Sequence, residues 1–202
     1  MSFSCPNIPL INDPKGLYIP IQDIQNRLGL LNWVEYSFGR AFTRKEPREE
    51  TTYIAPKVYA GNKEYLIVEP RDDVSAFTFI ELNGDETIND WETQGINRGY
   101  NSTQNISVVM FANLRKIDTD RDYIFDEELK LDLLKQIKDS PYVVTINSIE
   151  RGLSNVWSPY SYDTIEDVFY SDNFATYRIN CDIRLYQRCF EDQTFNLQTC
   201  KI

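Results

Sequence analysis

The sequence contains no histidine among its 202 residues. Histidine is the commonest general acid or base, and it activates the nucleophile in Ser-His and Cys-His pairs. Only carboxylate, lysine or tyrosine mechanisms would remain, and no pattern singles out a catalytic pair among the 31 acidic residues. The nucleotide-binding patterns GxGxxG and Walker A are also missing. We therefore expect a protein that is not an enzyme and needs no cofactor.

Cysteines are few, and none belongs to a CxxC pair. The four are Cys5, Cys181, Cys189 and Cys200. Without histidine to complete a mixed site, a structural zinc is not expected. Cys181 and Cys189 share parity in one alternating segment, too far apart for a disulfide in a straight strand. We expect reduced thiols, with Cys181 buried as a small hydrophobe.

One acidic segment has part of a calcium-loop pattern. Asp118, Asp120, Asp122 and Asp126 occupy its first, third, fifth and ninth positions. The sixth position, which calls for glycine, is Tyr123, and the twelfth, which calls for glutamate, is Leu129. We interpret the acidic residues as the start of a helix, and predict no metal site.

Long apolar runs are absent too. No stretch approaches the roughly 20 apolar residues of a membrane span, and the first residues lack the pattern of a signal peptide. The formal charge of -10 argues against non-specific binding of nucleic acid, which depends on cations. We expect a protein that works without a membrane, in the cytosol or in a particle assembled there.

Two segments have the apolar spacing of amphipathic helices. The first begins at Pro20 and places Ile21, Ile24, Leu28 and Leu31 on one face. The second covers residues 122–139, with Thr119 or Asp120 as its N-cap. Around them we expect an N-terminal arm over residues 1–19, one domain over 20–190 and a tail over 191–202.

The remaining apolar segments have the composition of strands. They cover residues 33–42, 53–59, 64–70, 74–82, 105–114, 141–150 and 174–189. Residues 43–52 contain no apolar side chain, and indicate an extended, solvated loop or the tip of a long hairpin. Residues 83–103 are predicted to be a long loop containing Trp91, and a short helical turn is predicted after Asp163. The fold class is α+β, a mostly antiparallel sheet with both helices packed on one face.

The segment FATYRINCDIRLYQRC alternates strictly. The side chains predicted to face the core are Ala175, Tyr177, Ile179, Cys181, Ile183 and Leu185. The side chains predicted to face water or a partner are Thr176, Arg178, Asn180, Asp182, Arg184 and Tyr186. Arginines on an exposed strand face are candidates for contacts between subunits.

A second charged cluster lies in the loop 43–52, where basic and acidic residues mix. Such a mixture favours a solvated tip or a salt-bridged surface between subunits over a DNA site. Together with the two strand arginines, the candidate subunit-interface residues are Arg40, Arg44, Lys45, Arg48, Glu49, Glu50, Arg178 and Arg184. Four aromatic residues, Trp91, Trp157, Tyr160 and Tyr162, either fix loops to the core or stack against a sugar or a protein.

The chain resembles the tail-completion proteins of tailed bacteriophages, the tail-terminator and head-tail joining group, in the form found in phages of Bacteroidetes. The resemblance covers most of residues 17–190, and its segments are IPIQDIQNRLGLLNW, GRAF, YIAPKVYAGNKEYLIVEPRDD, ISVVMFANLRKID and FATYRINCDIRLYQRC. It implies a structural virion protein, made in the host cytoplasm, that forms a homomeric ring at the neck or tail end. Its partners would be other neck, portal or tail proteins, with DNA only as cargo in the channel.

Two other functions compete with the ring. A carbohydrate- or receptor-binding virion module would use Trp91, Trp157 and nearby tyrosines. An acidic mimic of DNA would need carboxylates in regular exposed rows, a pattern that the sequence does not show.

Overall fold

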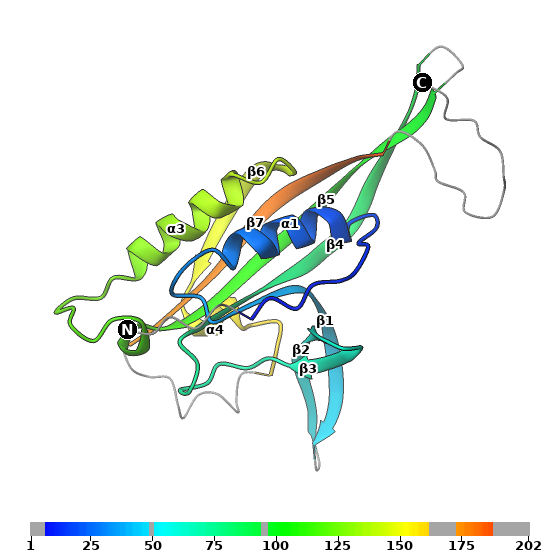
Figure 1. Cartoon of the computed structure of the whole chain (residues 1–202). Helices are drawn as coiled ribbons and strands as arrows, with labels where there is room; N and C mark the ends of the chain where they lie inside the picture. The colour runs from blue at the N-terminus through cyan, green and yellow to red at the C-terminus, as the bar shows by residue number, and fades with distance from the viewer. Residues whose placement is uncertain (1–6, 49–50, 94–96, 162–172, 188–202) are drawn as a thin grey trace.

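The computed structural model describes residues 7–48, 51–93, 97–161 and 173–187 (Figure 1). The helices are α1 (Tyr18–Leu28), α2 (Leu114–Ile117), α3 (Asp126–Lys138) and α4 (Leu153–Val156). The strands are β1 (Tyr36–Arg48), β2 (Thr51–Gly61), β3 (Glu64–Ile67), β4 (Ala76–Thr93), β5 (Asn97–Asn113), β6 (Val143–Arg151) and β7 (Phe174–Gln187). Among the residues described, no helix combines the length and the apolar character that crossing a membrane requires.

The seven strands form one sheet in the order β3-β2-β1-β4-β5-β7-β6. Every neighbouring pair is antiparallel except β1 with β4, which is parallel. The chain leaves β5 through α2 and α3, returns as the edge strand β6, and places β7 between β5 and β6. The predicted α+β class with a mostly antiparallel sheet is confirmed.

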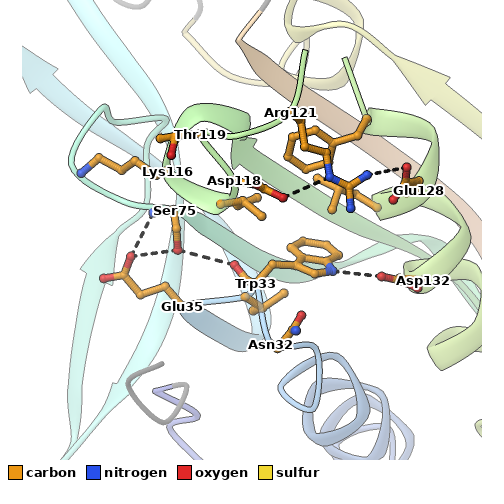
Figure 2. Close-up of a pocket in the computed structure, with 14 residues that line it drawn as sticks. Asn32, Trp33, Glu35, Ser75, Lys116, Asp118, Thr119, Arg121, Glu128 and Asp132 are labelled. Carbon is orange, nitrogen blue, oxygen red and sulfur yellow. Dashed lines mark hydrogen bonds and ion pairs between the residues drawn. The ribbon is translucent and has the colours of Figure 1, made fainter. Parts of the chain in front are cut away.

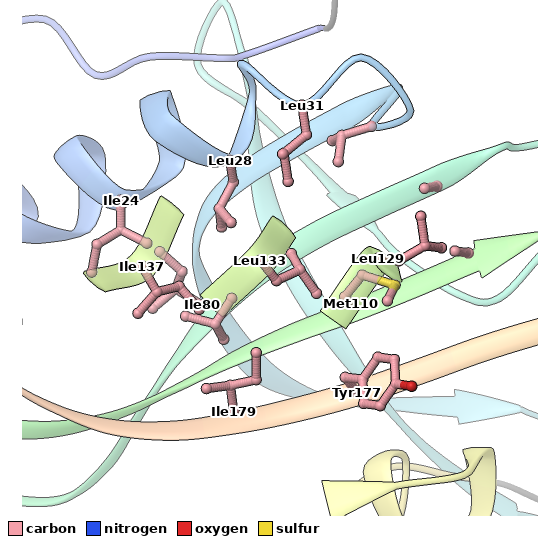
Figure 3. Close-up of a cluster of buried hydrophobic side chains, with 14 of the residues drawn as sticks. Ile24, Leu28, Leu31, Ile80, Met110, Leu129, Leu133, Ile137, Tyr177 and Ile179 are labelled. Atoms are coloured by element: carbon pink, nitrogen blue, oxygen red, sulfur yellow. The ribbon is translucent and has the colours of Figure 1, made fainter. Parts of the chain in front are cut away.

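Helices α1 and α3 pack against each other and cover one face of the sheet (Figures 1 and 3). Their buried side chains lie at helical spacing, which is the pattern that predicted them: Ile21, Ile24 and Leu28 on α1, and Leu129, Leu133 and Ile137 on α3. Alternate residues of β4, β5 and β7 complete this first core. Burying each aliphatic side chain contributes roughly 1.5–3 kcal/mol, so this face holds both helices in place.

A second core covers the opposite face of the same central strands. Phe77 and Phe111 stack with ring centroids 5.3 Å apart, and Trp157 lies edge-on to Phe79 at 5.8 Å. The segment from α4 to Tyr160 closes this core. Strands β4 and β5 are therefore buried on both faces, which explains why NISVVMFAN is apolar at consecutive positions.

Two predicted loops are strands. Strand β1 continues to Arg48 and pairs with β2 as far as the pair Arg48 and Thr51, so the hairpin interpretation of residues 43–52 is correct and the loop interpretation is wrong. Residues 83–93 and 97–103 belong to β4 and β5, which pair out to Thr93 and Asn97 beyond the helices (Figure 1). Such extensions lie outside both cores, so they need no apolar alternation, and the backbone hydrogen bonds of the ladder hold them.

The second helix begins later than predicted. Helix α3 starts at Asp126, and neither Thr119 nor Asp120 caps it; the residue at its N-cap is Phe125, which is buried in the first core. The chain forms the single turn α2 and then a loop before reaching Phe125. The acidic residues expected in the first turn are present, and their negative charges interact favourably with the positive end of the helix dipole.

The N-terminal arm is attached to the domain from residue 7 onward. The Asn7 amide donates to the Glu35 carbonyl at 2.9 Å, and the side chain of Gln25 on α1 donates to the Pro9 carbonyl at 3.1 Å. Helix α1 begins at Tyr18, inside the predicted arm. Residues 1–6, the predicted turn after Asp163, Tyr162 and the tail 191–202 lie outside the described residues.

Candidate functional site

A pocket of about 530 Å³ lies where the loop before α3 meets the turn after α1 (Figure 2). Its polar side chains contact one another. The indole nitrogen of Trp33 donates to Asp132 at 3.2 Å, and the Ser75 amide and hydroxyl donate to Glu35 at 2.9 and 3.2 Å. These contacts join segments distant in sequence, so the pocket walls are a structural junction.

Arg121 is the central cation of this junction. Its guanidinium donates to Asp118 at 3.1 Å and to Glu128 at 2.6 Å (Figure 2). The Asp120 amide and Arg121 lower the pKa of Asp118, and hydrogen bonds from Arg121 and Tyr123 lower the pKa of Glu128. The same bonds raise the pKa of Arg121. All three groups stay ionised and pair with one another, so these contacts stabilise the junction.

The partial calcium-loop segment is divided between two sets of contacts. Asp118 binds Arg121 at the pocket, whereas Asp126 accepts a hydrogen bond from Tyr177 of β7 at 2.6 Å. Within the described part of the chain, no group of three or more Cys, Asp or Glu side chains is placed to hold a metal ion. The carboxylates serve as helix-start and loop contacts.

The second core contains a buried ion pair. Arg178 of β7 pairs with Glu81 of β4, and its Nη2 also donates to the Val156 carbonyl at 2.7 Å. The Tyr160 hydroxyl donates to the same Glu81 carboxylate, and burial beside this charge raises the pKa of Tyr160. These bonds attach the α4 segment to the sheet. The expectation that Arg178 faces water or a partner is wrong, since it is 5% exposed.

Beyond this ion pair, the same face of the sheet carries a ladder of uncharged polar side chains. Asn83 donates to Asn105 at 3.0 Å and to Ser107 at 2.6 Å, and Ser107 donates to Asn180 at 2.5 Å. Asn180 continues the ladder by donating to Ser148 of β6 at 2.9 Å. The ladder joins β4, β5, β7 and β6 on a face that apolar residues no longer cover.

A cationic and aromatic surface lies on the arm formed by β1, β2 and β3. Strand pairing places Phe42 opposite Lys57 and Tyr59 opposite Tyr65, so these four side chains share one face with Arg44. We call these five residues the arm face. The Phe42 and Tyr65 rings lie 6.3 Å apart, and the Arg40 guanidinium lies over Phe42 at 4.5 Å. Phe42 and Tyr65 are 37% and 50% exposed.

The predicted interface residues do not form one site. Arg40 lies over the Phe42 and Tyr18 rings, and Arg44 and Lys45 are exposed on β1. Arg184 is half-buried near the end of β7, on a different part of the sheet from the arm. The side chains of Arg48, Glu49 and Glu50 lie outside the described residues.

The four aromatic residues singled out from the sequence do not form one surface site either. Trp157 and Tyr160 are buried in the second core, so sugar stacking on Trp157 is ruled out for the folded chain and its role in fixing a loop is confirmed. The side chains of Trp91 and Tyr162 lie outside the described part of the chain. The sequence analysis did not identify Tyr65 as a surface aromatic residue. The feature that could have indicated its exposure is its place in the short strand EYLI, which has charged neighbours.

The chain gives no match to any of the protein-family models scanned, and the search of curated proteins finds no relative. The function is therefore inferred from the surfaces of this molecule and from the resemblance in its sequence.

Proposed function

We propose that this chain is a structural virion protein that assembles with copies of itself into a ring at the neck or tail end of a tailed phage. The observation that carries the proposal is the arm face, because two exposed aromatic side chains and two cations lie on one face of the three-stranded arm (Figure 1). Exposed apolar groups of this kind, gathered on one surface, are typical of protein interfaces.

The geometry of the rest of the molecule fits a structural role. The pocket beside α3 holds charges that neutralise one another, and the buried pair Arg178 and Glu81 fixes α4 to the sheet. Both sets of contacts hold the fold together. Neighbouring neck, portal or tail proteins would bind the completed ring, and DNA would pass through it as cargo.

The oligomeric state of the purified chain tests the proposal. We expect multi-angle light scattering to give a closed multimer at high protein concentration, and electron micrographs to show rings. The variant Phe42→Ser/Tyr65→Ser, which removes both exposed rings, is expected to lower the assembled fraction. Leu30→Ser is the control, because Leu30 is also a large exposed apolar side chain, 75% exposed, but lies just after α1 and away from the arm face. A wild-type chain that stays monomeric at every concentration would overturn the proposal.

A further inference from the structure

We infer that the arm face of one copy docks against the acidic surface of residues 118–132 on the next copy. We call that second surface the acidic flank. This inference rests on the proposed function and names the two surfaces that would meet between ring neighbours. A closed ring requires a heterologous contact, in which one surface binds a different surface of an identical molecule. The arm face and the acidic flank have the charges and the apolar groups for such a contact.

The arm face is cationic and partly apolar. Phe42, Arg44, Lys57 and Tyr65, with Thr43, line a shallow groove of about 350 Å³, and no carboxylate lines it. On the opposite side of the arm, Ala41 and Val58 are buried in the second core. The arm-face side presents aromatic rings beside positive charge.

The acidic flank has the opposite character. Residues 118–132 contain seven acidic and two basic side chains. Arg121 and Lys130 are already paired within the flank, with Asp118 and Glu128 and with Glu127 respectively. The flank therefore keeps an excess of negative charge. It also exposes three large apolar or aromatic side chains, Tyr123, Ile124 and Leu131.

The two surfaces lie on opposite flanks of the molecule. In Figure 1 the arm of β1, β2 and β3 is at the lower right, and the loop that leads into α3 is at the far left. The arm face and the acidic flank of one copy lie apart in this view, so each is open to a different neighbour. Copies can join head to tail, with the arm face of each copy bound to the acidic flank of the next. In a protein of net charge -10, contact between the basic surface and the acidic surface is electrostatically favourable.

Charge reversal on each surface tests the contact. The arm variant is Arg44→Glu/Lys57→Glu and the flank variant is Asp120→Lys/Asp122→Lys. Each variant alone places like charges at every contact, and we expect the concentration needed for assembly to rise roughly tenfold to hundredfold. In an equal mixture, wherever the two variants alternate, a reversed arm meets a reversed flank and a native arm meets a native flank. Mixing the two defective variants is therefore expected to restore assembly.

The control Lys15→Glu/Arg71→Glu reverses two exposed cations outside both surfaces and makes the same change in net charge as the arm variant. It should assemble like the wild type, and circular dichroism should show all variants folded. If the wild type forms rings and the variants do so equally well, or if folded, defective variants are not rescued by mixing, the contact is wrong while the proposed ring stands. A wild-type chain that never assembles would overturn both.

Discussion

Replacing Arg178 with methionine would leave the Glu81 carboxylate in the second core without its cation. The side chains of Arg178 and Glu81 are 6% and 13% exposed, so water replaces the lost partner poorly. The Val156 carbonyl would also lose the guanidinium that now donates to it at 2.7 and 3.2 Å. Among the donors in the described part of the chain, the Tyr160 hydroxyl alone would remain to donate to Glu81.

The expected cost follows from these contacts. Removing one member of a buried ion pair lowers the free energy of unfolding by about 3–5 kcal/mol, because a buried charge is left uncompensated. For a chain of about 200 residues this corresponds to a fall in Tm of roughly 6–20 °C. Replacing both members with apolar residues, as in Arg178→Met/Glu81→Leu, removes both charges and should cost less than the sum of the two single changes.

Urea denaturation of the wild type, the two single variants and the double variant gives the coupling free energy of the pair. Hydrogen exchange over residues 153–160 reports whether the α4 segment opens before the rest of the fold, since Arg178 holds the Val156 carbonyl. A loss below about 1 kcal/mol for Arg178→Met would refute the reasoning, because it would mean that the carboxylate reaches solvent without cost. Strict additivity of the two changes would refute the direct pairing.

Two further predictions concern the first core. Leu133→Ala on α3 removes a fully buried side chain, and in urea denaturation it should lower the free energy of unfolding by about 2–5 kcal/mol. The control is Leu131→Ala on the same helix: Leu131 is 63% exposed, so the change should be less than about 0.5 kcal/mol. Burial raises the pKa of the Cys181 thiol from 9.0 to about 12, so the unfolded chain ionises first and stability falls as pH rises through this range. Cys181→Ala should make the fall shallower by up to about 1.4 kcal/mol per pH unit; an identical slope would contradict a buried thiol.

The helices and the inward face of β7 were predictable from spacing alone. All six side chains predicted to face the core on β7 are buried, Cys181 among them. Ile24 on α1 and Leu133 on α3 are buried at the positions that the period of 3.6 residues assigns. Local spacing suffices here because one face of each element meets an apolar neighbour, whichever neighbour that is.

The alternation of β7 correctly predicted which side chains point away from the first core. It did not predict what surrounds them. The pleat places Arg178 opposite the first core, but whether that side meets water depends on what else packs there. The segment from α4 to Tyr160 packs there, and its position is set by contacts with β4 and β5, far away in the sequence. The arm face has the same origin, since Phe42 and Tyr65 meet only because β1, β2 and β3 pair side by side.

Residue types and their spacing within single elements were enough to predict the α+β class, the buried faces of the helices and the lack of histidine chemistry. Long-range packing determines that residues 83–93 and 97–103 are paired strands, that Trp157 is buried, and that the arm face and the acidic flank lie in separate parts of the molecule (Figure 1). Those features depend on which distant segments pack together. Paired strands made of polar residues have no alternation of apolar and polar residues, so the sequence pattern does not predict them.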